Sequence, residues 1–318
     1  MELVAPHPRG RARHTPLSLQ RLEDRVVPGF ADLSAYDQLL VELINRARAE
    51  PLAEAARHGI DLNEGLPPGT ISPDPKPPLA PHQALITAAG LHSDDMLARN
   101  FFAHTNPDGL GPGHRTRAAG WAGGSISENL SWGTSYGSQT AGTEERHRSL
   151  FRSTSGHRQN MLDPAWDVVG TGVTFGSSPY RSLSFPGTPV SLATENFGDS
   201  GQAFITGVVF DDRTVDDDFY TPGEGLGGVT VTAVSASDPA VRFSTTTADA
   251  GGYALAVPAG VYTVTVSGPG FEQPAAVAGV TVGGVNVKVD FVPDGSRPPS
   301  PPPAPPAPPP PLGAPRPG

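Results

Sequence analysis

The sequence predicts an α+β protein in which a domain of mixed helices and strands precedes a small all-β sandwich. Apolar residues recur at helical spacing between residues 35 and 99, whereas short β-branched runs separated by Gly and Pro follow residue 200. Of the 37 prolines, 13 lie between Pro298 and Pro317, which favours an extended tail without a core. We therefore expect a basic N-terminal arm, a mixed domain, a β-sandwich and a Pro-rich disordered tail at residues 1–34, 35–200, 201–293 and 294–318.

The composition excludes several classes of function. A net charge of −10 over 318 residues, without a basic cluster, argues against a nucleic-acid surface. No apolar run approaches the roughly 18 residues that a membrane-spanning helix needs, so we expect no integral helical membrane protein. The absence of cysteine removes disulfides, Cys zinc ligands and Cys nucleophiles together.

The N-terminal arm bears on export. Five arginines lie in the first 30 residues, but no apolar stretch of about 7 to 15 residues, as a signal peptide requires, accompanies them. The segment from Leu19 to Pro28 resembles a short motif that heads many bacterial surface and secreted proteins. That resemblance favours export, and an ordinary basic arm is the alternative.

The first domain opens with helical periodicity. An apolar stripe from Leu39 to Ala47 predicts helix within residues 35–58, and Pro51 leaves open whether there is one helix or two. The other expected elements are a Pro-rich loop at 62–81, a helix at 82–99, polar functional loops at 100–137, a helix at 140–151, and strands at 168–175 and 192–197.

The second domain shows regular short strands with Gly and Pro turns between them. This spacing is typical of an all-β sandwich of roughly 90 residues. The expected strands lie at residues 204–210, 229–234, 241–247, 253–257, 261–266 and 280–291.

Four motifs between His92 and Leu162 identify a family. They read HSDDM at 92–96, NFFAHTNPDG at 100–109, SENLS at 127–131 and SGHRQNML at 155–162. In content and order they resemble the CAP superfamily of cysteine-rich secretory proteins, antigen 5 and pathogenesis-related one proteins, whose domain is also called SCP. The resemblance covers residues 35–198, and it implies an α-β-α sandwich with a central cleft in a protein that acts outside the cytoplasm.

By this resemblance, His104 and His157 match the two cleft histidines and Glu128 matches the glutamate of the family's Glu-Asn motif. Two neutral imidazoles can hold a divalent metal such as Zn²⁺, with a carboxylate beside them as ligand, orienting group or base. Many relatives add a second glutamate where this chain has Thr154. The alternatives are that both histidines only hydrogen-bond to loops and that Glu128 is a buried carboxylate that accepts backbone N–H groups.

Other histidines and two glycine motifs receive simpler interpretations. We expect His92, which lies on an apolar stripe, to be a core residue, and His114 and His147 to face solvent. A G-x-S-x-G string at 133–137 lacks the buried strand that a nucleophile elbow requires. A G-x-G-x-x-G string at 223–228 precedes a strand instead of a helix, so no phosphate site is expected.

The second domain begins with an acidic stretch. This stretch and the strand after it resemble the B-type repeats of Gram-positive adhesins, which are Cna-B-like sandwiches with calcium in an acidic first loop. Clustered carboxylates supply the oxygen ligands that Ca²⁺ prefers, and a solvated acidic loop is the alternative. The candidate calcium ligands are Asp211, Asp216, Asp218 and Glu224.

These observations predict an exported bacterial CAP-domain protein, displayed at the cell surface by a β-sandwich spacer and a Pro-rich tail. We expect the cleft to bind a lipid, a sterol or a wall polymer together with a divalent metal. One alternative is a metal-assisted hydrolase in which Glu128 accepts a proton from water. The other is a structural surface module without ligand chemistry. The sequence assigns neither a nucleophile nor an oligomeric state.

Overall fold

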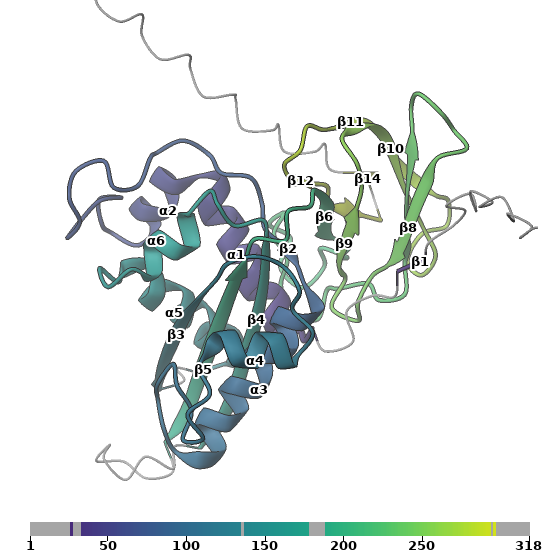
Figure 1. Ribbon diagram of the computed structural model, residues 1–318. Helices are drawn as coiled ribbons and strands as arrows, with labels where there is room; N and C mark the ends of the chain where they lie inside the picture. The colour runs from purple at the N-terminus through teal and green to yellow at the C-terminus, as the bar shows by residue number, and fades with distance from the viewer. Residues whose placement is uncertain (1–25, 28–32, 135–136, 178–187, 294, 297–318) are drawn as a thin grey trace, which may run out of the picture.

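The computed structural model describes residues 26–27, 33–134, 137–177, 188–293 and 295–296 (Figure 1). Its first part mixes helices and strands and its second part contains strands alone, which confirms the predicted α+β class. The expected Pro-rich tail and most of the expected N-terminal arm lie outside the described residues. Within the described residues, no helix is long and apolar enough to cross a membrane.

The first helical segment is two helices. Helix α1 (Ala35–Ala49) begins at Ser34, whose hydroxyl accepts a hydrogen bond from the Asp37 backbone N–H, while the Asp37 carboxylate accepts from the Ser34 N–H. This reciprocal pair is a capping box, which satisfies two backbone donors at the helix start. Pro51 then starts helix α2 (Pro51–Arg57), because its missing N–H costs nothing at the first helical position.

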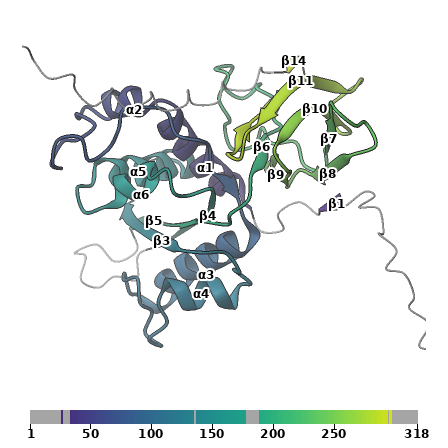
Figure 2. The same cartoon turned by 45° about the horizontal axis from the view of Figure 1, so that its top comes forward.

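The first domain has three layers. A sheet in the order β2-β4-β5-β3 lies between helices α3 and α4 on one face and helices α1, α5 and α6 on the other (Figures 1 and 2). This α-β-α arrangement confirms the predicted architecture. The further elements are α3 (Gln83–Arg99), α4 (Pro112–Ala118), α5 (Gln139–Arg152), α6 (His157–Leu162), β2 (Ala80–Pro81), β3 (Ile126–Thr134), β4 (Val168–Ser177) and β5 (Pro189–Gly198).

Two glycines in β4 let α3 lie directly on the sheet. A Cβ at Gly170 would stand 2.0 Å from the Leu85 backbone carbon, and one at Gly172 would stand 2.3 Å from that of Ala89. Any side chain there would collide with helix backbone, which cannot move aside locally. The V-V-G-T-G-V string at residues 168–173 therefore sets the distance between α3 and β4.

The second domain is built from two sheets and a short ribbon. The sheets have the orders β1-β8-β7-β10-β11 and β12-β6-β9, and β13 pairs with β14. The expected strand at 280–291 is broken, because the left-handed Gly284 (φ +95°) turns the chain after β11. The strands are β1 (Val26–Val27), β6 (Phe204–Val208), β7 (Thr230–Ser235), β8 (Arg242–Thr246), β9 (Gly252–Ala256), β10 (Gly260–Ser267), β11 (Ala275–Val282), β12 (Val287–Lys288), β13 (Phe291–Val292) and β14 (Gly295–Ser296).

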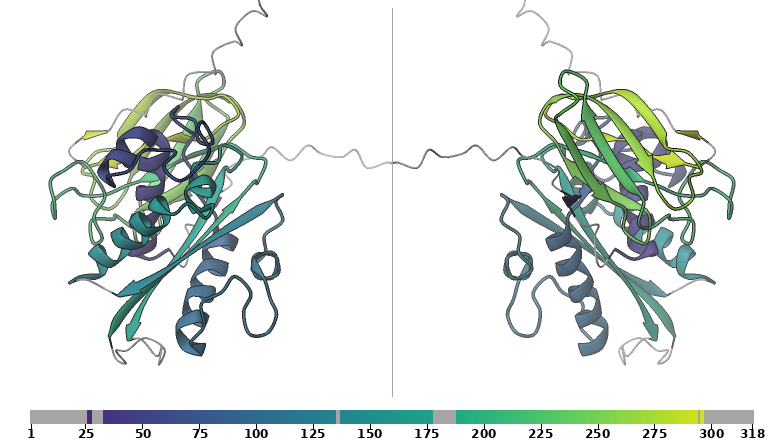
Figure 3. Two further views of the ribbon diagram at one scale, coloured as in Figure 1. Left: turned by 90° about the vertical axis from the view of Figure 1, so that its left-hand side faces the viewer. Right: turned by 90° about the vertical axis from the view of Figure 1, so that its right-hand side faces the viewer.

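The sandwich packs against α1 and is not a separate spacer (Figure 3). Leu39 and Leu43 on the outer face of α1 share a buried apolar cluster with Phe210 of the second domain. Beside this cluster, Lys288 Nζ lies 2.9 Å from the Glu42 carboxylate in a buried ion pair. Apolar contacts and paired charges therefore join the two domains into one body.

Candidate functional site

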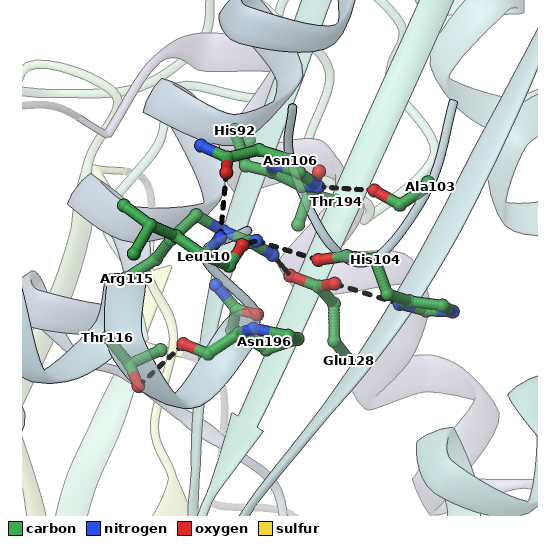
Figure 4. Close-up of polar contacts among 12 residues, drawn as sticks. His92, Ala103, His104, Asn106, Leu110, Arg115, Thr116, Glu128, Thr194 and Asn196 are labelled. Carbon is green, nitrogen blue, oxygen red and sulfur yellow. Dashed lines mark hydrogen bonds and ion pairs between the residues drawn. The ribbon is translucent and has the colours of Figure 1, made fainter. Parts of the chain in front are cut away.

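Glu128 lies buried on β3, the edge strand of the first sheet, and contacts two basic side chains (Figure 4). Its Oε1 lies 2.8 Å from His104 Nδ1, and its Oε2 accepts a 2.5 Å hydrogen bond from Arg115 Nη2. Because an ionised carboxylate only accepts, His104 Nδ1 donates, and in the neutral ring Nε2 presents a lone pair. The His104 side chain is 53% exposed, so this lone pair is open to a ligand.

Arg115 on α4 fixes the loop that carries His104. Its Nη1 donates to the backbone carbonyls of His104 at 2.7 Å and Leu110 at 2.8 Å, while Nη2 holds Glu128. One planar guanidinium therefore joins the loop to β3, which a flexible lysine could not do with the same geometry. The role of Arg115 was not predicted from the sequence, because the seven-residue α4 around it contains Pro and Gly and no apolar stripe.

The loop between His104 and Arg115 is held by its own polar side chains. The Asn106 Oδ1 accepts backbone hydrogen bonds from Asp108 at 3.1 Å and from Leu110 at 2.9 Å. Gly109 follows in the left-handed conformation at φ +79°. The N-P-D-G string of the second motif is thus a turn that positions the loop.

His92 is a core residue, as expected. It is 1% exposed on α3, and its Nε2 lies 3.1 Å from the Ala103 carbonyl oxygen. Burial lowers the pKa of His92, so the neutral ring donates this hydrogen bond. His92 therefore anchors the residue before His104.

His157 begins α6 after the left-handed Gly156. Burial, and after it the charge of nearby His104, lower the pKa of His157. His157 is also tied to the sheet, because its carbonyl oxygen accepts a 3.0 Å hydrogen bond from the Asn129 side chain.

A buried carboxylate that was not predicted from the sequence lies next to Asn129. Glu195 on β5 is fully buried, and its Oε2 accepts a 2.9 Å hydrogen bond from the same Asn129 amide. Its Oε1 has no partner among the described residues. Burial raises the pKa of Glu195 to about 7, against the opposing hydrogen bond from Asn129. The only sequence signal was a charged residue inside an otherwise uncharged strand.

A second cluster of histidines lies away from the cleft. His147, expected in solvent, is 1% exposed because α5 turns it towards Glu54 on α2. One ligand atom each of Glu54, His58 and His147 lies within 4.8 Å of the others, so this group could hold a metal ion. Within the described part of the chain it is the only such group of three. Glu128 and the cleft histidines are not within that limit.

The acidic loop of the second domain is organised by Glu224. This buried carboxylate accepts backbone hydrogen bonds from Thr214 at 2.9 Å, Val215 at 3.1 Å and Thr221 at 2.7 Å. Its role in the structure is to shape the loop.

The candidate calcium ligands differ in their surroundings. Asp211 forms a 2.7 Å ion pair with Arg213, whereas Asp216 and Asp218 are exposed. Asp212, which the sequence analysis did not select, accepts a 2.8 Å hydrogen bond from the Asp218 backbone. A calcium site formed by Asp211, Asp216, Asp218 and Glu224 stays a prediction.

Comparison with known families identifies both domains. Residues 41–183 match the family model CAP, described as the cysteine-rich secretory protein family. The first domain is a CAP domain. Residues 214–292 match the carboxypeptidase regulatory-like domain, so the sandwich after the CAP domain matches a different family from the expected adhesin repeat.

Two solved bacterial structures resemble parts of the chain. An extracellular SCP-domain protein from Bacillus anthracis is 21% identical, with a TM-score of 0.33 over 51% of this chain. An outer surface protein from Borrelia burgdorferi is 15% identical, with a TM-score of 0.28 over 38% of this chain and 77% of its own. The match spans 40% of the Bacillus protein's length. No curated protein matches this chain.

Proposed function

We propose that this chain acts outside the cytoplasm as a CAP-domain binding protein, with its ligand site between His104 and His157. The observation that carries the proposal is the 2.8 Å contact between Glu128 and His104 Nδ1, which turns the exposed Nε2 outwards as an acceptor. Arg115 keeps Glu128 in place from its other oxygen. A carboxylate behind an exposed imidazole is the arrangement that orients histidine ligands in metal sites.

The proposal extends to a divalent metal at the same place. His104 and His157 would hold the ion, which would offer its open positions to a ligand as a Lewis acid. Both oxygens of Glu128 already accept hydrogen bonds, and its side chain is 2% exposed. Glu128 is therefore better suited to orienting His104 than to taking a proton from water, which favours binding over hydrolysis.

The surroundings of His104 suit a ligand with an apolar part. Phe102 is 39% exposed and Leu110 is 43% exposed, and both lie in the segment that carries His104. Exposed aromatic and aliphatic side chains beside a polar acceptor favour an amphipathic lipid or a sterol over a wall polymer.

A matched set of variants of the full chain tests the proposal. The double variant His104→Ala, His157→Ala removes the cleft acceptors, and His114→Ala, at an exposed histidine, is the control. We expect wild type and control to cosediment with lipid or sterol vesicles at least tenfold more than the double variant does. Equal cosedimentation of all three proteins would refute cleft binding. Selective retention on insoluble wall polymer instead of vesicles would overturn the apolar ligand assignment.

A further inference from the structure

Glu54, His58 and His147 form a compact group outside the CAP cleft. The Glu54 Oε1 lies 3.0 Å from His58 Nε2 and 2.9 Å from His147 Nε2. We propose that these three side chains form a separate site for a zinc-class divalent cation. Two imidazole nitrogens and one carboxylate oxygen are a ligand set that zinc takes in proteins, with further positions left to water.

The distances suit a metal after a small adjustment. Zinc lies about 2.0 to 2.2 Å from nitrogen and oxygen ligands, so neighbouring ligand atoms of a tetrahedral site are about 3.3 Å apart. The nitrogen-to-oxygen distances of 2.9 and 3.0 Å must therefore widen by roughly 0.3 to 0.4 Å. Small side-chain rotations would provide this change, because the three ligand atoms already lie within 4.8 Å of one another.

The helices fix the three ligands without a loop. Glu54 and His58 are four residues apart at the end of α2, so they share one side of the helix, and His147 faces them from α5. The Phe151 ring covers both imidazoles at centroid distances of 5.2 and 6.0 Å. An apolar wall of this kind excludes water and strengthens metal coordination.

His147 is the more buried of the two imidazoles in this group. The residue is 1% exposed, and its Nδ1 has no partner among the described residues. Its Nε2 is the atom that would bond to the metal, in place of its 2.9 Å contact with Glu54 Oε1. His58 forms the outer side of the group at 9% side-chain exposure, which gives an ion a route from solvent.

Two arginines set the selectivity of the site. Arg46 and Arg57 each donate to the Glu54 Oε2 at 2.9 Å, and Arg46 also reaches Oε1 at 2.9 Å. Their charges repel any cation, so weakly bonding Mg²⁺ or Ca²⁺ should not compete. A cation with strong bonds to imidazole, such as Zn²⁺, is the class that fits.

Zinc titration of the full chain after chelator dialysis tests the site. Isothermal titration is done on the cleft double variant His104→Ala, His157→Ala, alone and combined with His58→Gln. We expect the double variant to bind one zinc ion and His58→Gln to weaken that binding at least tenfold. The control His114→Gln, combined with the same double variant, should leave the zinc affinity unchanged.

The outcomes separate this site from the cleft. If the double variant binds no zinc while wild type does, the metal belongs to the cleft and the second site is refuted. If His58→Gln leaves zinc affinity unchanged in the double variant, the assignment of these ligands is overturned. Far-ultraviolet circular dichroism checks folding. His58 is chosen because its side chain, at 9% exposure, is less buried than that of His147, where Gln would disturb the core.

Discussion

At the scale of residues, the candidate site is organised by one carboxylate that contacts two basic side chains. Glu128 gives one oxygen to His104 and the other to Arg115. The buried charge is therefore paired and hydrogen-bonded, as a charge inside a protein must be. The same bonds decide which nitrogen of His104 faces solvent, so a structural interaction also sets the chemistry of the exposed atom.

Glu195 makes the stability of the fold depend on pH. Its pKa rises from 4.5 to about 7 on burial, so the folded state binds the proton more tightly than the unfolded chain. Its contribution to stability is therefore complete below about pH 4.5 and is lost as the pH rises towards 7. A shift of this size corresponds to about 3 kcal/mol between these limits.

Glu195→Gln should remove this dependence, because the amide stays neutral and can still accept from Asn129. We expect urea unfolding to show wild type losing free energy of unfolding between pH 5 and pH 8, with a smaller loss in the variant. The exposed Glu144→Gln is the control and should follow wild type. Parallel pH profiles of wild type and Glu195→Gln would contradict the buried, proton-binding role of Glu195.

At the scale of elements, the sequence predicted those helices and strands whose buried apolar residues recur at regular spacing. Helices α1, α3 and α5 and strands β4 and β5 lie within a few residues of their expected bounds, because their apolar residues repeat towards one core. Strand β3 was expected to be a loop. Its Glu128 and Asn129 are buried and hydrogen-bonded to His104, His157 and Glu195, so these polar contacts replace the apolar alternation that would have revealed the strand.

The family motifs recovered part of what periodicity missed. They selected His104, Glu128 and His157, and the structure ties Glu128 to His104 and the His157 carbonyl oxygen to Asn129, the residue after Glu128. They did not reveal Arg115 or Glu195, whose roles depend on contacts between distant elements. The same reason explains His147, which was expected in solvent and is buried against Glu54.

The contact between α3 and β4 gives a direct test at this scale. A Cβ at Gly172 would meet the Ala89 backbone at 2.3 Å, so Gly172→Ala should lower the free energy of unfolding by about 3 kcal/mol or more. Gly90→Ala on α3 is the matched control, since nothing lies within 4 Å of its added Cβ. That variant should gain up to about 1 kcal/mol from helix propensity.

Denaturant unfolding of both variants checks this contrast. Similar midpoints for Gly172→Ala and Gly90→Ala would show that the helix can move away from the strand. The contact would then not set the position of α3.

At the scale of the whole molecule, the two domains share a buried interface. Lys288 lies between Glu42 of α1 and Asp290 of the sandwich, and the charges raise the pKa of Lys288 against the effect of burial. The sequence could not predict this arrangement, because its partners come from segments more than 200 residues apart. The β-sandwich, which the sequence analysis interpreted as a spacer, packs against α1 and covers its outer face.

Lys288→Met should therefore lower the free energy of unfolding of the CAP domain, although Lys288 itself lies in the sandwich. The variant leaves Glu42 buried without its cation, which costs about 3 to 5 kcal/mol. All three tryptophans, Trp121, Trp132 and Trp166, lie in the first domain, so tryptophan fluorescence reports on CAP unfolding alone. We expect its denaturant midpoint to fall in Lys288→Met and to stay unchanged in the exposed control Arg242→Met.

An unchanged fluorescence midpoint in Lys288→Met would show that the domains unfold independently. A second probe, tyrosine absorbance, reports on both domains, because three of the six tyrosines, Tyr220, Tyr253 and Tyr262, lie in the sandwich. Coincident transitions of the two probes in wild type are the expected signature of one cooperative unit.

The covering of α1 by the sandwich also has a consequence for biosynthesis. The Asn286 side chain donates to the Pro78 carbonyl across 208 residues, so the interface closes only when the last strands have been made. At about 5 to 20 residues per second, a ribosome needs roughly 10 to 40 seconds to add that length. During this interval the apolar outer face of α1 is uncovered on the nascent chain, which makes it a natural site for a chaperone to hold before the fold is complete.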